Sequence, residues 1–361
     1  MAPGSMAGGM TEIYQEGLRI PPIRIAKNHE ILDDVLDLVL LNVRVPEERK
    51  GDYMAQIAAN KLGARRLQEL FTKWTREQVS EGCTGIIEAV TRRMRAGIAD
   101  LPDGKYEFTD VLDDDGMGTT NIPICVKIDI QSDEIWLNFE GSAPQVTGNM
   151  NNSFAGLQAS VLFALKVLID PDGPTNHGML DPVYIGAPEA SVVNASFPAA
   201  TAARAQTCQR IIDVILGALA PAVPERVIAA CNGANGVATF SGEGPDGQYY
   251  LYMETIGGGA GGRSYKDGSD GIQVHVTNTS NLPVEALENE YPLLVERYEL
   301  VENSGGAGKW RGGMGLRRVY RGLGHTLTFS GQGERAVTPP WGLFGGKGCL
   351  LYTSPSPRDR G

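Results

Sequence analysis

Residues 254–263, ETIGGGAGGR, constrain the fold of this chain more than any other segment, because they carry so few side chains. Glycine loses more backbone entropy on folding than any other residue, so a dense run of glycines is costly unless its backbone is used. Such a run permits left-handed conformations and lets backbone amides approach an anion, a ligand or another segment. We therefore expect an ordered glycine loop at a site, with a structural turn as the alternative.

The same run matches the dinucleotide pattern G-x-G-x-x-G at Gly257, Gly259 and Gly262. That fingerprint needs a preceding strand, which residues 249–256 would supply, and a helix that begins at the glycines. Residues 264–272 are instead rich in turn formers and lack the apolar period of a helix. The pattern therefore does not indicate a nicotinamide or flavin fold.

The composition is that of an ordinary globular protein, with 42% hydrophobic and 21% charged residues. A net charge of −11 without a basic cluster disfavours nucleic acid and anionic membranes as partners. No apolar run approaches the roughly 18 residues of a membrane span, and no secretory signal is visible. The five cysteines are dispersed and form no CxxC, so we expect a cytoplasmic protein with reduced thiols.

The apolar pattern predicts an α+β fold, in which a helical N-terminal segment precedes a β-rich mixed body with inserted helices. Helical spacing continues to about residue 100, and the face predicted for one helix comprises Met54, Ile57, Ala58, Leu62, Leu67 and Phe71. In the body we expect strands at 105–111, 122–130 and 135–139 and helices at 154–169 and 206–219. The acidic triplet at 113–115 reads as an exposed turn rather than a calcium loop, because it lacks the alternate ligand spacing.

Chemical motifs are sparse. The four histidines share no helix turn and form no HExxH, and the chain has neither a GxSxG elbow nor a P-loop. No metal ligands are therefore predicted within this chain. Any reaction must use residues that are dispersed in the sequence or supplied by another chain.

Four polar segments stand out against this background. Glu12 and Glu16 would share one face of a helix, which suits an acid/base pair or a cation site, although a solvated helical turn is the simpler interpretation. Asn149 belongs to the amide-rich segment 148–153, of which helix capping explains only one residue. Arg204 lies among small residues and is expected to pair with a carboxylate of the protein or of a ligand. Asn278 belongs to a strand that runs into an amide-rich turn.

Taken together, these segments resemble the hydantoinase B/oxoprolinase family. The matching stretches occur in order over roughly residues 1–348 and include TEIYQEGLRIP at 11–21, GSAPQVTGNMNNS at 141–153, ETIGGGAGGR at 254–263, HVTNTSNLPVE at 275–285 and SGGAGKWRGGMG at 304–315. Because the match is colinear over most of the chain, it is specific although no single motif is.

The resemblance implies a subunit or domain of an ATP-dependent enzyme that opens cyclic amides such as hydantoins, 5-oxoproline or lactams. A separate hydantoinase A-type subunit would use the ATP, so a hetero-oligomer is expected. A subunit of the acetone or acetophenone carboxylase type is the alternative, because related carboxylases share the fold. Glu12 and Glu16 are then candidates for acid/base or metal-supporting roles. The candidates for binding substrate or an anion are Asn149, Arg204, Glu254, Gly257, Gly258, Gly259 and Asn278.

The departures from the family pattern also carry expectations. Family members bind a divalent metal through histidines and aspartates that precede the part matched by residue 1, and they continue beyond residue 349. We therefore expect a partial domain over 1–349 that lacks the metal ligands and is inactive alone. Residues 350–361 have no hydrophobic pattern and are expected to be a disordered, non-native tail. The competing interpretation is a non-catalytic remnant that retains only partner binding.

Overall fold

The computed structural model describes residues 9–28 and 30–349, so the expected tail lies outside the described residues. The chain divides into two compact units: Gly17–Val90, and Met1–Glu16 together with Thr91–Gly361. Helices and mixed sheets confirm the predicted α+β class. A single domain over 1–349 stays a prediction. No helix in the described ranges is both long and apolar enough to cross a bilayer.

The Gly17–Val90 unit is mainly helical. A short antiparallel pair of strands precedes the helices, and the elements in chain order are β1 (Ala26–Lys27), β2 (Glu30–Ile31), α1 (Asp33–Leu41), α2 (Pro46–Phe71) and the start of α3 (Arg76–Ala99). Pro46 occupies the first turn of α2, where its missing N–H costs no hydrogen bond. The structure thus contains the long helix that the sequence predicts.

The apolar face predicted for α2 is largely uncovered. Ile57 is buried, whereas Leu62, Leu67 and Phe71 are 46%, 53% and 41% exposed. A period of 3.6 residues places these side chains on one stripe, but burial needs a second surface against that stripe. Among the described residues, no such surface covers this end of α2.

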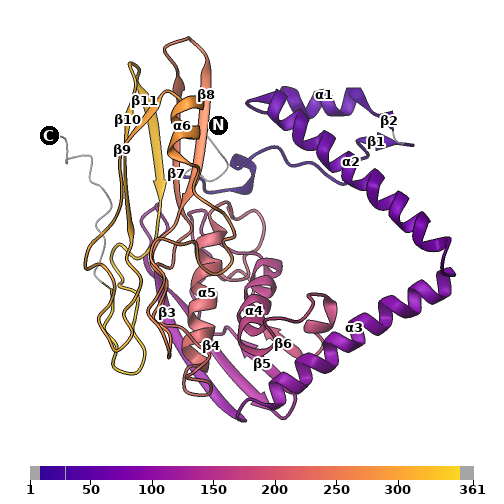
Figure 1. The fold of residues 1–361 in the computed structure, drawn as a ribbon, viewed down its shortest axis with the longest axis vertical. Coiled ribbons are helices and arrows are strands. Elements are labelled where there is room, and N and C mark those ends of the chain that lie inside the picture. The colour runs from indigo at the N-terminus through magenta and orange to yellow at the C-terminus, as the bar shows by residue number, and fades with distance from the viewer. Residues whose placement is uncertain (1–8, 29, 350–361) are drawn as a thin grey trace. The chain divides into compact units, whose positions relative to one another are not determined.

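A four-stranded sheet forms the base of the larger unit (Figure 1). Its strands are β3 (Gly104–Asp114), β4 (Thr120–Gln131), β5 (Glu134–Asn138) and β6 (Val183–Gly186), in that order. Neighbours pair antiparallel, except that β5 and β6 are parallel. On β4, every second residue is at most 1% exposed: Ile122, Ile124, Val126, Ile128 and Ile130. This alternation buries one face of the strand and is the pattern that the sequence predicts.

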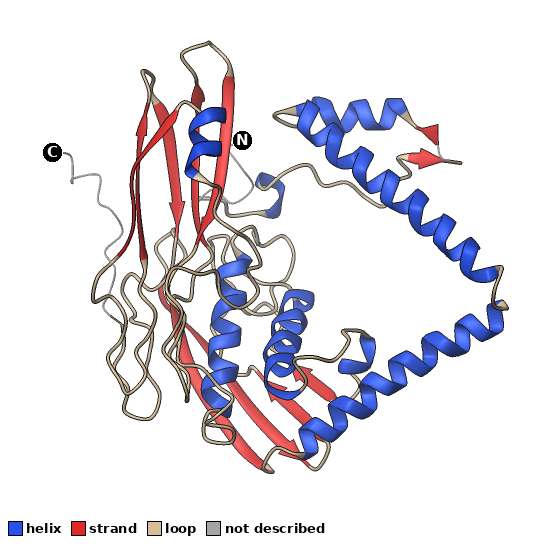
Figure 2. Ribbon diagram, in the orientation of Figure 1, coloured by secondary structure: helices blue, strands red, loops and turns tan. Residues whose placement is uncertain are grey.

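Two helices cover the sheet, α4 (Phe154–Ile169) and α5 (Arg204–Leu219), and they pack against each other (Figure 2). Ser153 caps α4, because its Oγ accepts a hydrogen bond from the amide of Gly156 at 3.2 Å. In α5, 14 of the 16 residues are buried. A helix buried on all sides forms the centre of this unit, so polar residues on it must find partners inside the protein.

The remaining strands form two further sheets. One has the antiparallel order β11 (Leu327–Gln332), β7 (Gly236–Glu243), β8 (Tyr249–Ile256), and the other pairs β9 (Leu293–Leu300) with β10 (Leu316–Gly322). Their shared core joins Phe240 and Tyr252 to Leu287 and Leu293. Leu287 lies on α6 (Val284–Glu290), a short helix that the sequence did not predict.

The acidic triplet is not the exposed turn that the sequence predicts. Asp113 and Asp115 are 8% and 4% exposed. The Asp113 carboxylate accepts hydrogen bonds from three successive amides of a loop more than 200 residues later, at 2.6–2.9 Å. Asp115 accepts from the amide of Gly148 at 3.0 Å and from two nearby amides. Both carboxylates therefore hold loops in place. The exposed turn was the wrong prediction because the main partners of these carboxylates lie far away in the sequence.

Candidate functional site

Polar segments that lie far apart in the sequence meet at the amino-terminal end of α5. The 3-10 helix Ile13–Gln15 follows Glu12, which forms an antiparallel bridge with Ala199 in the loop before α5. The asparagine-rich segment reaches the same loop, because the carbonyl of Asn149 accepts a hydrogen bond from the amide of Ala203 at 2.9 Å. We call this meeting of residues 11–16, 148–152 and 198–204 the α5 junction.

The two glutamates have different environments at the α5 junction. Glu12 is exposed, and its amide donates to the Gln15 side chain at 3.1 Å. The Glu16 carboxylate instead accepts hydrogen bonds from the amides of Thr201 and Ala202, both at 2.6 Å. A carboxylate just before a helix interacts favourably with the partial positive charge of the helix amino terminus. Glu16 therefore positions the loop that leads into α5.

Arg204 is the first residue of α5 and is exposed. Within residues 9–28 and 30–349 it makes no ion pair, so an internal carboxylate partner is not found there. Asn149 is close by in the same junction and is 3% exposed. The structure thus brings Glu12, Glu16, Asn149 and Arg204 together, and Arg204 presents a positive charge that no ion pair among the described residues neutralises.

The glycine run is used for close packing of backbone against backbone. A Cβ at Gly259 would lie 2.1 Å from the carbonyl oxygen of Gly313, and one at Gly261 would lie 1.8 Å from that of Ala229. Neither distance is possible for a real side chain. None of the glycines in the run has a left-handed φ. Of the two uses expected from the sequence, close approach is therefore the one that occurs.

Several amides of the run already have acceptors inside the protein. The Gly258 amide donates to the carbonyl of Ile272 at 2.9 Å, and that of Gly261 to the Cys231 sulfur at 3.5 Å. Gly257 follows β8 directly, and a Cβ there would lie 2.9 Å from the backbone of Ile272. Gly257 and Gly258 are thus packed against a neighbouring segment.

Glu254 lies inside the strand core rather than at an open site. Its side chain is 4% exposed, and Arg318, which is fully buried, donates to both carboxylate oxygens at 2.7 Å. Asn278 is exposed, between two threonines that are anchored to Gln209 and Thr255. The structure therefore does not bring Glu254 and Asn278 into the α5 junction through any contact found among the described residues.

A buried charge network was not predicted from the sequence. Asp213 on α5 accepts from His275 Nε2 at 3.0 Å and from Arg335 at 2.8 Å, and Arg335 also donates to Asp110 at 2.7 Å. Arg210, one turn before Asp213, lies 3.1 Å from Glu334 and is fully buried. Two opposite charges three residues apart, directly beside the apolar run of α5, are the signal that would have indicated this network.

These contacts shift the pKa values of the network. Burial opposes the charge on Asp213, but His275 and the arginines lower its pKa to about 2. Burial likewise opposes charge on His275, but Cys231 and Asp213 raise the pKa of the imidazole to about 10. Burial raises the pKa of Glu334 to about 7, although Arg210 counteracts this. At neutral pH His275 is therefore an imidazolium held by a carboxylate, which is a structural ion pair.

The divalent metal implied by the resemblance does not fit the described residues. Within residues 9–28 and 30–349, no three His, Cys, Asp or Glu side chains are arranged to hold a metal ion. Glu16 and Asp213 already accept hydrogen bonds from the protein itself.

A family model described as hydantoinase B/oxoprolinase matches residues 1–352. An uncharacterized protein, MJ0963, from Methanocaldococcus jannaschii is 40% identical over 96% of this chain and 60% of its own length. The B-type subunit of a putative D-/L-hydantoinase from a Pseudomonas species is 34% identical over 93% of this chain and 58% of its own. The beta subunit of the caprolactamase from Pseudomonas jessenii is 34% identical, over 94% and 60%. The chain therefore spans roughly 60% of each of these three relatives.

Two solved structures share the fold. The ATP-dependent caprolactamase from Pseudomonas jessenii superposes with a TM-score of 0.83 at 30% identity, over 89% of this chain and 57% of that one. A nucleotide-free acetone carboxylase superposes with a TM-score of 0.89 at 18% identity, over 96% and 49%. At 18% identity the second similarity establishes the fold alone.

Proposed function

Because this chain belongs to the hydantoinase B/oxoprolinase family, we propose that it is a subunit or domain of an ATP-dependent enzyme that opens cyclic amides. The substrate class is hydantoins, 5-oxoproline or lactams, and a separate A-type subunit uses the ATP. The similarity to the beta subunit of a caprolactamase and to the B-type subunit of a hydantoinase supports the substrate class and a second subunit. The similarity to the solved ATP-dependent caprolactamase supports the use of ATP.

The division of labour has a chemical reason. An unstrained amide is a poor electrophile, and phosphorylation of its oxygen with ATP on the partner subunit creates a leaving group. Water can then attack the carbonyl carbon, while the developing negative charge is stabilised by preorganised donors. The contribution of this chain would be to bind and orient the activated substrate and to neutralise its charge.

The observation that supports this proposal is the exposed Arg204 at the α5 junction, whose positive charge has no ion-pair partner among the described residues. Glu16 already occupies the loop amides before α5 with a carboxylate of the protein. Arg204 is then the group at this junction that remains able to bind a carboxylate or phosphate of a ligand, because a guanidinium matches both geometries. The buried network around Asp213 holds α5 in place behind it.

The test uses a full-length enzyme of this family with its A-type partner. ATP hydrolysis is measured with hydantoin, 5-oxoproline, caprolactam, and acetone with bicarbonate. Replacing the counterpart of Arg204 by alanine should raise KM by about tenfold or more, because a charge-assisted hydrogen bond is worth ~1.5–3 kcal/mol. Replacing the counterpart of Arg321, which is exposed on β10 and pairs with Glu296 at 3.1 Å, is the matched control. Unchanged kinetics of the Arg204 variant would refute its role.

A carboxylase-type subunit is the second candidate, and the shared fold with acetone carboxylase is the observation that favours it. Bicarbonate-dependent ATP hydrolysis with acetone, and none with the cyclic amides, would select this candidate. The third possibility is a chain that only binds the partner. Binding of the partner without stimulated ATP hydrolysis, when the whole family enzyme is active, would select that one.

A further inference from the structure

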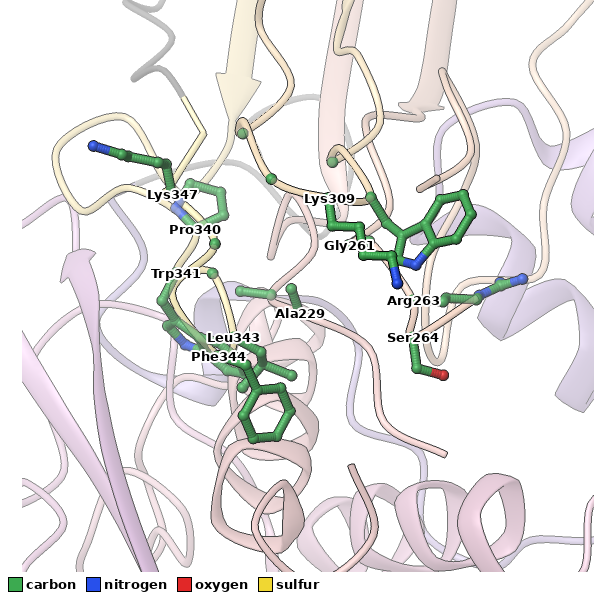
Figure 3. A pocket seen from close by; sticks show the side chains of 18 of the residues that line it. Ala229, Gly261, Arg263, Ser264, Lys309, Pro340, Trp341, Leu343, Phe344 and Lys347 are labelled. Carbon is green, nitrogen blue, oxygen red and sulfur yellow. The ribbon is translucent and has the colours of Figure 1, made fainter. Parts of the chain in front are cut away.

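A pocket of about 440 Å³ opens beside the glycine run and lies outside the α5 junction. This volume is within the roughly 300–1,000 Å³ of typical small-molecule sites. Figure 3 shows Trp341, Leu343 and Phe344 on one wall and Arg263 and Ser264 across the gap. Its lining includes no residue of 11–16, 148–152 or 198–204. The pocket is therefore a separate place in the fold that the proposed function does not use.

The charge of this pocket is opposite to that of the protein. Its lining contains Arg263, Lys309 and Lys347, but Glu225 as its one carboxylate, in a chain of net charge −11. Glu225 lies 4.0 Å from Arg226, which is not part of the lining. Within the described ranges none of the three lining cations has a carboxylate within 4.0 Å. The pocket therefore has an excess of uncompensated positive charge, which favours an anion.

The cations differ in where they point. In Figure 3 the ammonium of Lys309 is directed into the space between the walls, whereas Lys347 extends away from it. Lys309 also lies in a loop whose amides are available. In the described part of the chain, the amides of Gly308, Lys309 and Trp310 donate no hydrogen bond. These amides and the ammonium can therefore donate hydrogen bonds to phosphate or carboxylate oxygens.

The opposite wall provides an ordered aromatic surface. Trp341 Nε1 donates to the buried carboxylate of Asp110 at 2.9 Å, and its ring lies 4.9 Å from that of Phe108. The indole is therefore fixed in position by the charge network beneath it. Trp310 and Phe344 add two more aromatic rings to the lining. Flat, rigid aromatic surfaces bind planar ligand rings at little entropic cost.

We propose that this pocket binds a small organic anion in which a planar ring is joined to a phosphate or carboxylate group. The ring would lie against Trp341, and the anionic group would bind Lys309 and the amides of residues 308–310. The chemistry of recognition is the same for both anionic groups, so the ligand used as a probe decides between them. None of its lining belongs to the α5 junction, on which the proposed function rests, so the two proposals can fail separately.

Isothermal titration calorimetry with the whole 361-residue chain tests the proposal. The probes are AMP, which has a ring and a phosphate, benzoate, which has a ring and a carboxylate, and adenosine and inorganic phosphate, which each have one part. AMP should bind at least about tenfold more tightly than adenosine or inorganic phosphate, and binding of benzoate shows whether a carboxylate serves in place of the phosphate. Lys309→Met should weaken that binding by about tenfold, since it removes a charge-assisted contact. Lys347→Met is the matched control and should change it less than about twofold.

Each outcome has a defined meaning. Binding of AMP but not benzoate identifies the ligand group as a phosphate, and the reverse identifies a carboxylate. If adenosine binds as tightly as AMP, or if neither AMP nor benzoate binds, the anion site is refuted. If Lys347→Met weakens binding as much as Lys309→Met, a diffuse positive field replaces the specific site and the proposal fails. Circular dichroism of each variant separates loss of binding from loss of fold, and Trp341→Leu tests the ring surface in the same way.

Discussion

Replacing Glu254 by glutamine should destabilise the fold, because this glutamate is the counter-ion of a fully buried arginine. The carboxylate is 4% exposed and accepts two hydrogen bonds from Arg318 at 2.7 Å. It also accepts from the hydroxyls of Tyr252 and Tyr320 at 2.6 and 3.0 Å, and from the amide of Leu282 at 2.8 Å. Burial, reinforced by this carboxylate, raises the pKa of both tyrosines.

Glutamine keeps the size of the side chain but removes its charge. The guanidinium of Arg318 would then remain buried between the rings of Tyr298 and Tyr320, whose centres lie 4.7 and 5.2 Å away. Breaking a buried ion pair in this way costs about 3–5 kcal/mol. The whole free energy of unfolding of a domain is about 5–15 kcal/mol, so Glu254→Gln should remove a large part of it.

Urea unfolding followed by circular dichroism measures this cost. The double variant Glu254→Gln with Arg318→Met should recover much of the stability, because it removes both charges together. Glu299→Gln is the control: Glu299 is 44% exposed and pairs with Arg317, so the change should cost about 0–1 kcal/mol. If Glu254→Gln costs no more than this control, the ion pair is not structural, and Glu254 becomes available again as a site residue.

Three further predictions follow from local geometry. Gly261→Ala should destabilise the protein strongly, because the added Cβ would lie 1.8 Å from the Ala229 carbonyl oxygen. The control Gly63→Ala, on the exposed face of α2, meets nothing within 4 Å and should stabilise the protein by about 1 kcal/mol. Equal urea midpoints of the two variants would contradict the packing role of the glycine run. The pKa of His275 in the folded state is raised to about 10, so the stability that its charge contributes is complete below about pH 6.5 and is lost as the pH rises toward 10. A free energy of unfolding that stays constant from pH 6.5 to 9.5, or that falls equally in the His275→Gln variant, would exclude this ion pair. Ser153→Ala removes the cap of α4 and should lower the free energy of unfolding by about 1 kcal/mol, while Ser153→Asp should retain most of the stability. An equal loss in both variants would exclude capping as its cause.

The sequence determined those features that depend on near neighbours. The alternating apolar residues of β4 and the apolar runs of α4 and α5 predict elements that the structure contains. Periodicity is sufficient there, because the residues on one face of a strand or helix are buried or exposed together. The colinear motifs likewise identified the family, which the match over residues 1–352 confirms. The helical character of α2 was also predictable, but not which surface would cover its apolar face.

The tertiary structure alone decided which polar residues are structural and which remain available. Glu254 and Arg318 are 64 residues apart, and Asp110 and Arg335 are 225 apart. With 32 basic and 43 acidic residues in the chain, nothing local selects these pairs. The folding of the strands and of α5 brings them together, and burial then requires each charge to be matched. The same process left Arg204 exposed at the end of α5, where the sequence could not distinguish an internal partner from a ligand.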